Sequence, residues 1–317
     1  ILNYLHWRWL FVLVLPIALG ALWLGFRRIE NVTEPRDAPL DVASVVLSVF
    51  AFGGIVYGLG LLGVPPVPGQ PPAWAPLVIG AVAMIVFVQR QLKLQQTNSA
   101  LLDLRVFASR NFTVSLSMFA VLMLGLFGTI ILLPIYLQNV LNISTLQTGL
   151  LLLPGGLLMG QLGRRAGRWY DRIGPAKLVI PGVIIVTVVL WAMTMLGTQS
   201  RIEYILAGHI VMSIGFGLLF TPLFTVSLSS VPPQLYSHGS AVLGSLQQVA
   251  GAAGLAPFFA LMTAQSARLA SAGAVPVEAL AGGIRAAFLC GAIIALLAVA
   301  CAFLVRKPSA PPVPTAH

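Results

Sequence analysis

Nine long, mostly apolar runs constrain the fold of this chain more than any other feature. A membrane-spanning helix needs about 20 mostly apolar residues, within a range of about 17–25. The runs cover residues 9–26, 41–63, 73–89, 112–137, 145–163, 178–197, 202–230, 239–262 and 284–305. Only 8% of the residues are charged, whereas a water-soluble domain carries about 25%. We therefore predict an all-α membrane protein with about nine transmembrane helices, whose surroundings are the lipid bilayer.

The positive charges lie between the runs in an alternating pattern. With the N-terminus placed outside, 14 of the 18 Lys and Arg residues fall on the cytoplasmic side. The remaining four are Arg8, Arg201, Arg268 and Arg285. Cytoplasmic loops of membrane proteins carry such an excess of Lys and Arg. The pattern predicts a multi-pass protein with a cytoplasmic C-terminus, and it accounts for the net charge of +10 without a nucleic-acid partner.

The acidic residues and the glycine motifs argue against an enzyme. All eight Asp and Glu residues lie in loops or at the ends of runs, and the chain has no GxSxG, HExxH or GxxxxGK[ST] motif. The segment GLGLLG at Gly58–Gly63 lacks the strand and helix that a dinucleotide site requires around GxGxxG. Gly54 and Gly58 instead form a GxxxG spacing, which lets membrane helices pack closely. We predict no enzymatic activity, no cofactor and no metal site.

Six polar side chains within or at the ends of the runs are candidates for lining a cavity. Such groups usually face the interior of a helix bundle or a wet cavity. They are Gln138, Gln161, His209, Thr221, Gln247 and Gln248. The alternative for each is a hydrogen bond between helices. That alternative is favoured for Gln138 and Gln161, which lie near the ends of their runs, and it stays open for His209 and the glutamine pair.

A charged stretch separates the fifth and sixth runs and is predicted to be a cytoplasmic loop. Its sequence, GQLGRRAGRWYDRIGPAK, covers residues 160–177. It resembles the signature Gly-x-Leu-x-Asp-Arg-x-Gly-Arg-Arg/Lys of major facilitator transporters. The matching residues are Gly167, Asp171, Arg172, Gly174 and Lys177. Trp169 replaces the usual Leu, and Pro175 replaces a basic residue.

Three further stretches are similar to the drug–proton antiporters of this superfamily that have fourteen spans. HWRWLFVLVLPIALG (residues 6–20) resembles their sixth helix, LLDLRVFASRNFTVS (101–115) the loop before their ninth, and LLPIYLQNVLNISTLQTGLLLLPGG (132–156) their ninth and tenth helices. The resemblance implies that the chain covers spans six to fourteen of such a protein. Five helices of the N-terminal half, with the acid expected to take the coupling proton, would be missing.

The resemblance also implies a division into five parts. These are residues 1–29, the last helix of the N-terminal half; 30–92, an inserted two-helix hairpin; 93–111, a cytoplasmic linker; 112–308, the C-terminal six-helix half; and 309–317, a disordered tail. The implied function is proton-coupled export of drugs or other small amphipathic molecules across a cell (inner) membrane, with Asp171 and Arg172 in a cytoplasmic gate. The alternative is a truncated, non-transporting membrane protein or scaffold.

Overall fold

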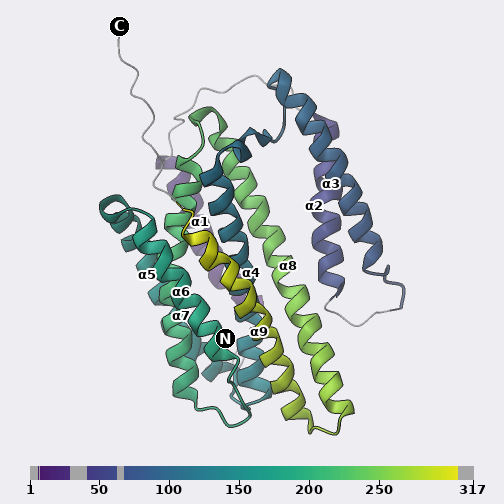
Figure 1. The fold of residues 1–317 in the computed structure, drawn as a ribbon, viewed down its shortest axis with the longest axis vertical. Coiled ribbons are helices and arrows are strands. Elements are labelled where there is room, and N and C mark those ends of the chain that lie inside the picture. Colours follow the sequence, from purple (N-terminus) through teal and green to yellow (C-terminus); the bar gives the residue numbers. More distant parts are fainter. Residues whose placement is uncertain (1–5, 7, 29–40, 63–67, 306–317) are drawn as a thin grey trace. The chain divides into compact units, whose positions relative to one another are not determined.

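The computed structural model describes residue 6 and residues 8–28, 41–62 and 68–305, which form long helices joined by short connections (Figure 1). The predicted tail, residues 309–317, lies outside the described residues. The chain divides into two units, Ile1–Pro39 and Leu40–His317. The first unit contains helix α1 (Arg8–Arg28), which ends in Arg27 and Arg28. The guanidinium of Arg27 lies 4.8 Å from the ring centre of Trp23.

The described residues of the second unit form eight long helices and three short 3₁₀ turns. Its elements are α2 (Val42–Leu62), α3 (Trp74–Leu94), η1 (Gln95–Thr97), η2 (Leu104–Ala108), α4 (Arg110–Asn139), α5 (Thr145–Ile173), α6 (Ala176–Met193), α7 (Ile202–Ser229), η3 (Pro233–Leu235), α8 (Tyr236–Ser271) and α9 (Pro276–Ala302). The predicted all-α fold is confirmed for the described part of the chain.

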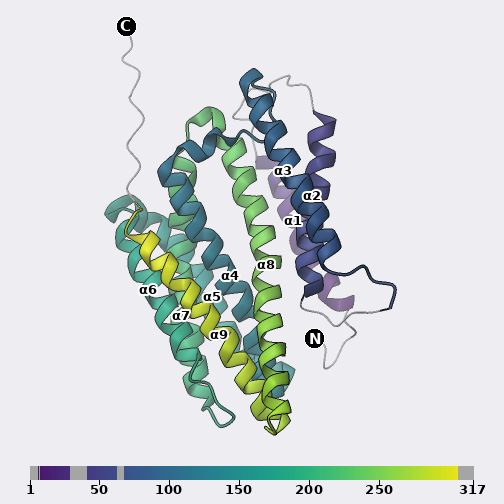
Figure 2. The ribbon, with the colours of Figure 1, turned by 45° about the vertical axis from the view of Figure 1, so that its right-hand side comes forward.

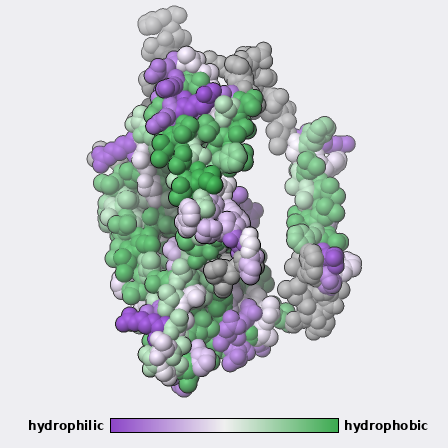
Figure 3. All heavy atoms as spheres, turned by 90° about the vertical axis from the view of Figure 1, so that its right-hand side faces the viewer, coloured by the Kyte–Doolittle hydropathy of each residue, from purple (hydrophilic) through white to green (hydrophobic). Residues whose placement is uncertain are grey.

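Eight of the described helices are long and apolar enough to cross a membrane, namely α1–α4 and α6–α9. Helix α5 is not among them, because glutamines, glycines and arginines lower its hydropathy. The count of nine spans therefore stays a prediction. In the space-filling view, hydrophobic side chains cover much of the face shown, while hydrophilic side chains gather near its top and bottom and in a group near its middle (Figure 3).

Helices α4–α9 pack around one apolar core. Helix α7 packs against α4, α5 and α6, while α9 packs against α4, α6 and α8. Large side chains from three of these helices are almost fully buried, including Tyr136 of α4, Phe216 of α7 and Phe288 of α9. Burial of such rings contributes most of the contact area in a core of this kind.

Helices α2 and α3 form a hairpin whose backbones approach closely. A Cβ atom added to Gly54 would lie 2.8 Å from the Cα of Gly80, and one added to Gly58 would lie 2.9 Å from the backbone nitrogen of Leu77. Only glycine fits such contacts. The close packing predicted from Gly54 and Gly58 is thus confirmed. Helix α2 also packs against α8, which lies between the hairpin and α4 (Figure 2).

The prediction that residues 160–177 form a loop is wrong for most of that stretch. Helix α5 continues to Ile173, and only Gly174 and Pro175 connect it to α6. Arginine is a good helix former, and charged residues at a span end still lie in water or headgroups, so charge alone does not mark the end of a helix. Gly174 has φ 80°, a conformation that glycine adopts readily, and its N–H donates to the Tyr170 carbonyl (2.9 Å).

The interval between the apolar runs 239–262 and 284–305, which we also expect to include an outside loop over residues 264–283, is mostly helical instead. Helix α8 continues to Ser271, and α9 already begins at Pro276. The segment is rich in alanine, the residue with the highest helix propensity. Its scattered polar residues therefore lie on helical turns rather than in an irregular connection.

Candidate functional site

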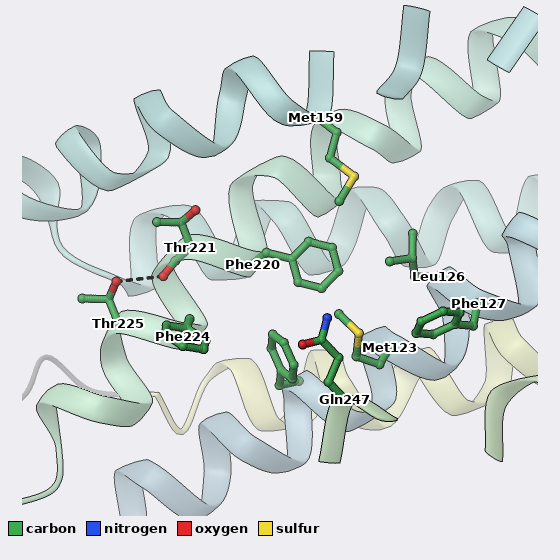
Figure 4. A pocket seen from close by; sticks show the side chains of 10 residues that line it. Met123, Leu126, Phe127, Met159, Phe220, Thr221, Phe224, Thr225 and Gln247 are labelled. Carbon is green, nitrogen blue, oxygen red and sulfur yellow. Dashed lines mark hydrogen bonds between the residues drawn. The ribbon is translucent and has the colours of Figure 1, made fainter. Parts of the chain in front are cut away.

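Four helices of the second unit line a pocket that is open to its surroundings and has a volume of about 480 Å³, called here the Gln247 cavity (Figure 4). The lining residues are Phe119, Met123, Leu126 and Phe127 of α4, Met159 of α5, Phe220, Thr221, Phe224 and Thr225 of α7, and Gln247 of α8. This volume lies within the range of about 300–1,000 Å³ that is usual for small-molecule sites. Apolar walls with a few polar groups are also typical of such sites.

The walls are mainly aromatic and thioether side chains. The rings of Phe119 and Phe220 meet edge to face with centroids 5.7 Å apart. Phe220 also stacks on Phe216, which is buried behind it, at 5.5 Å. Aromatic packing of this kind gives a ring a defined orientation, whereas methionine adapts its shape to what it touches. The cavity therefore combines aromatic rings of fixed orientation with methionine side chains that can change conformation.

Some polar groups of the cavity already make hydrogen bonds within the protein, and one does not. The Thr225 hydroxyl donates to the Thr221 carbonyl (2.9 Å), and the Thr221 hydroxyl donates to the Gly163 carbonyl of α5 (3.2 Å). In Figure 4 the Gln247 amide points toward Phe220 and Met123. Within residues 41–62 and 68–305 this amide makes no hydrogen bond. Gln247 therefore offers both a donor and an acceptor to a bound molecule.

The structure brings only two of the six candidate polar residues, Thr221 and Gln247, into this cavity. Gln247 and the neighbouring Gln248 are both exposed, but only Gln247 lines the cavity. Adjacent residues on a helix point about 100° apart, so the two glutamines cannot share one face. The aromatic lining gave no sequence signal, because a phenylalanine facing a cavity looks the same in an apolar run as one facing lipid.

The other three candidates lie elsewhere. Near the end of α4, the Gln138 amide oxygen accepts a long hydrogen bond from the Thr145 hydroxyl (3.4 Å). His209 of α7 lies against α5, with its Nε2 atom 3.2 Å from the Leu152 carbonyl oxygen. Gln161 lines an open groove along one face of α5. That groove has a volume of about 480 Å³ and is otherwise lined by Arg164, Arg165 and Arg168.

The five candidate gate residues occupy the end of α5 and the start of α6. A Cβ atom added to Gly167 would lie 3.7 Å from the Thr221 Cγ2 atom, so this glycine is next to the wall of the Gln247 cavity. Asp171, Arg172 and Lys177 are exposed, and none of them has an ion pair within the described residues. Gly174 forms the turn described above.

A partly buried polar network, which the sequence did not indicate, joins the hairpin to the segment that follows it. Arg90 of α3 donates to both carboxylate oxygens of Asp41 (2.7 and 2.8 Å), just before α2. The Gln91 amide, fully buried, donates to the Ser44 hydroxyl (2.7 Å), and its oxygen accepts from the Leu102 backbone N–H (3.0 Å). We call these five residues the clasp. The hydrogen bonds from Arg90 hold the pKa of Asp41 well below its usual range.

The next residues continue this network toward α8. The Asp103 backbone N–H donates to Nδ1 of His238 (3.2 Å). The buried Asp103 carboxylate pairs with Arg105, which also donates to the side-chain amide oxygen of Asn98 (2.8 Å). Burial raises the pKa of Asp103, but the hydrogen bonds from Arg105 outweigh this and hold it below its usual value. The linker is thereby attached to both the hairpin and α8.

A family model and several known proteins are similar to this chain. A family model described as Major Facilitator Superfamily matches residues 1–255. The chain is 36% identical over 312 residues to the lincomycin resistance protein LmrB of Listeria monocytogenes, covering 97% of this chain and 65% of that protein. It is 34% identical over 318 residues to LmrB of Bacillus subtilis, with the same coverage. It is 27% identical over 264 residues to the multidrug efflux pump LfrA of Mycolicibacterium smegmatis, covering 83% of this chain and 51% of that protein. The chain thus spans 65% of the length of the two LmrB relatives.

Proposed function

Because this chain belongs to the major facilitator superfamily, we propose that it works, with any further sequence its gene encodes, as a multi-pass exporter of drugs or other small amphipathic molecules. The Gln247 cavity is the observation that carries this proposal. It has the volume and apolar walls of a small-molecule site, with an amide ready to orient a ligand. The names of the relatives, lincomycin resistance protein and multidrug efflux pump, support the same class of substrate.

The finer assignment follows the resemblance to fourteen-span drug–proton antiporters. In this proposal α1 is span six and the last helix of the N-terminal half, α2 and α3 are the inserted pair, and α4–α9 are the C-terminal half, with the C-terminus in the cytoplasm. Substrates bind near the middle of the membrane, where such transporters place their sites. The second wall of the site and the acid that takes the coupling proton belong to the preceding helices, since no Asp or Glu lies deep in these spans.

The main test of the proposal compares two adjacent glutamines of α8. Gln247→Leu removes the free amide while keeping the side-chain volume close, and the exposed Gln248→Leu is the matched control. A hydrogen bond contributes about 0.5–1.5 kcal/mol, so we expect up to about tenfold weaker lincomycin resistance for Gln247→Leu in a drug-sensitive host. Gln248→Leu keeps its resistance. Equal resistance in both variants, at equal protein levels, would remove the Gln247 cavity from the transport route.

The gate is tested separately with Asp171→Asn. Asp171 lies in the last turn of α5, where the helix dipole disfavours a carboxylate by about 0.3–1 kcal/mol. An interaction of that size shifts an equilibrium between two conformations by a few-fold. We expect export in everted vesicles to fall by roughly threefold to fivefold in this variant, with normal membrane insertion. Unchanged efflux would leave Asp171 with a topological role alone. The exposed Arg165→Gln is the control for loss of one charge from the same helix.

A further inference from the structure

A second pocket, half open to its surroundings and about 360 Å³ in volume, lies between the α2–α3 hairpin and helices α4 and α8. We call it the hairpin cavity. Twelve of its thirteen lining residues are apolar, and Ser245 is the exception. The lining comes from separate parts of the chain, for example Phe52 of α2, Phe87 of α3, Leu116 of α4 and Val249 of α8. It is therefore a product of the tertiary fold and not of one helix.

The linker between α3 and α4 closes one end of the hairpin cavity. Leu102, Leu104 and Phe107 belong to the lining. The Leu102 backbone is held by the buried Gln91 amide (3.0 Å), and the Phe107 ring packs edge to face on Phe112 at 5.8 Å. At the end nearest the clasp, the apolar side chains of the linker thus cover the cavity, and hydrogen bonds of the clasp hold the linker in place.

The cavity is too large and too apolar to remain empty at no cost. Protein interiors are packed as densely as organic crystals, and a void deprives its lining of dispersion contacts. Water does not compensate, because it needs two to four polar partners. Each wall helix has the length and composition of a membrane span, so the medium available to fill the cavity is hydrocarbon.

We propose that the hairpin cavity is a binding site for one acyl chain of a membrane phospholipid. A transported drug needs polar groups that fix its orientation, and this cavity offers only the Ser245 hydroxyl. A flexible chain needs none. This assignment does not depend on the proposed export function.

The charges near the closed end suit the phosphate of such a lipid. Arg90 is neutralised by Asp41 and Arg105 by Asp103. Lys93, at the end of α3, and Arg110, at the start of α4, are exposed and have no carboxylate partner within the described residues. These two cations flank the linker that covers the cavity, and a phosphate nearby would gain a favourable electrostatic interaction.

Photolabelling tests the site. The protein is reconstituted in vesicles of phosphatidylcholine and phosphatidylglycerol that contain a phosphatidylcholine with a diazirine in one acyl chain. After irradiation, adducts are located by mass spectrometry. Phe87 and Leu116 line the cavity and are only 2% and 7% exposed, so lipid at the protein perimeter does not reach them. We expect adducts on these two residues.

Two substitutions to phenylalanine give the control. Val249→Phe fills the cavity, whereas Val82→Phe adds the same ring on an exposed position of α3 outside the lining. We expect roughly tenfold less labelling of Phe87 and Leu116 in Val249→Phe, since the ring replaces several chain methylenes, and no change in Val82→Phe. Val88→Phe gives a second filling variant should Val249→Phe fail to elute as a folded protein.

Three outcomes would overturn the proposal. The first is labelling confined to exposed residues, and the second is labelling of Phe87 and Leu116 that neither filling variant reduces. The third is loss of that labelling when ethidium is added, which would assign the cavity to amphipathic cations instead of lipid.

Discussion

The two cavities lie on either side of α8 and differ in what they offer a ligand. The Gln247 cavity has an unbonded amide and two threonines among aromatic rings, whereas the hairpin cavity has one serine among apolar side chains. Both are of small-molecule size. The difference shows that volume and hydrophobicity alone do not identify a substrate site. Polar groups that can fix the orientation of a ligand distinguish a site for a defined solute from a space for hydrocarbon.

The largest expected effect comes from forcing helices α2 and α3 of the hairpin apart. Gly80→Val would place a Cβ atom 2.6 Å from the Ile55 backbone nitrogen, and backbone cannot move aside as a flexible side chain can. Overpacking costs about 1–3 kcal/mol, and we expect the upper end of that range, measured as a lower thermal unfolding temperature in detergent. Gly53→Val is the control, because its added Cβ would meet nothing within 4 Å.

This variant also separates the two cavities functionally. We expect lipid labelling of Phe87 to disappear in Gly80→Val while export per folded molecule is retained. If export and labelling fall together, the cavities are coupled and the distinction between them fails as a functional one.

A smaller effect is expected from the clasp. Gln91→Leu leaves the Leu102 backbone N–H without its side-chain acceptor, and a buried donor without a partner costs about 1–3 kcal/mol. We expect a loss of about 2 kcal/mol in unfolding free energy and weaker lipid labelling, because the lid of the hairpin cavity is no longer held. The exposed Gln89→Leu, two residues earlier on α3, should change neither quantity.

The smallest effect concerns pH. Because the Arg90 hydrogen bonds hold the pKa of Asp41 below its ordinary value of 3.8, the carboxylate stabilises the folded state fully above that pH. The contribution is lost only as the pH falls below 3.8 toward the lowered pKa. Asp41→Asn should therefore lower the unfolding temperature slightly and equally at pH 7 and pH 5. If Asp41→Asn lowered the unfolding temperature by different amounts at pH 7 and at pH 5, Asp41 would be shown to titrate normally in the folded protein.

The long helices could be predicted from the sequence because a bilayer demands uninterrupted apolar runs. Their ends could not, since Ala-rich and Arg-containing segments are good helix formers whether or not lipid surrounds them. Residues 264–271 and 164–172 are helical for this reason. The sequence predicted one side of the contact between Gly54 and Gly80. The GxxxG spacing marks a surface of α2 that can pack closely, but it does not identify the helix that packs against it.

The candidate site was predictable only where a polar residue stands out against an apolar background. Thr221 and Gln247 had that contrast, but so did Gln248, and the sequence cannot tell which of two adjacent residues lines the cavity before the packing of α8 is known. Asp41 and Arg90 are 49 residues apart. Their contact depends on the hairpin turning back on itself, and no local pattern encodes it.

Helix α8 gives both cavities one wall, with Gln247 facing one and Ser245, Leu246 and Val249 facing the other. Four of the five positions 245–249 therefore face one or the other of two environments that favour different side chains. Under the two proposals, a substitution at Gln247 that alters substrate preference acts on the same helical turn that contacts the acyl chain. Its effect on fitness depends on which residues already occupy the opposite face. Within this turn, evolutionary changes are expected to be epistatic, and resistance variants here should arise as compensated pairs more often than as single replacements.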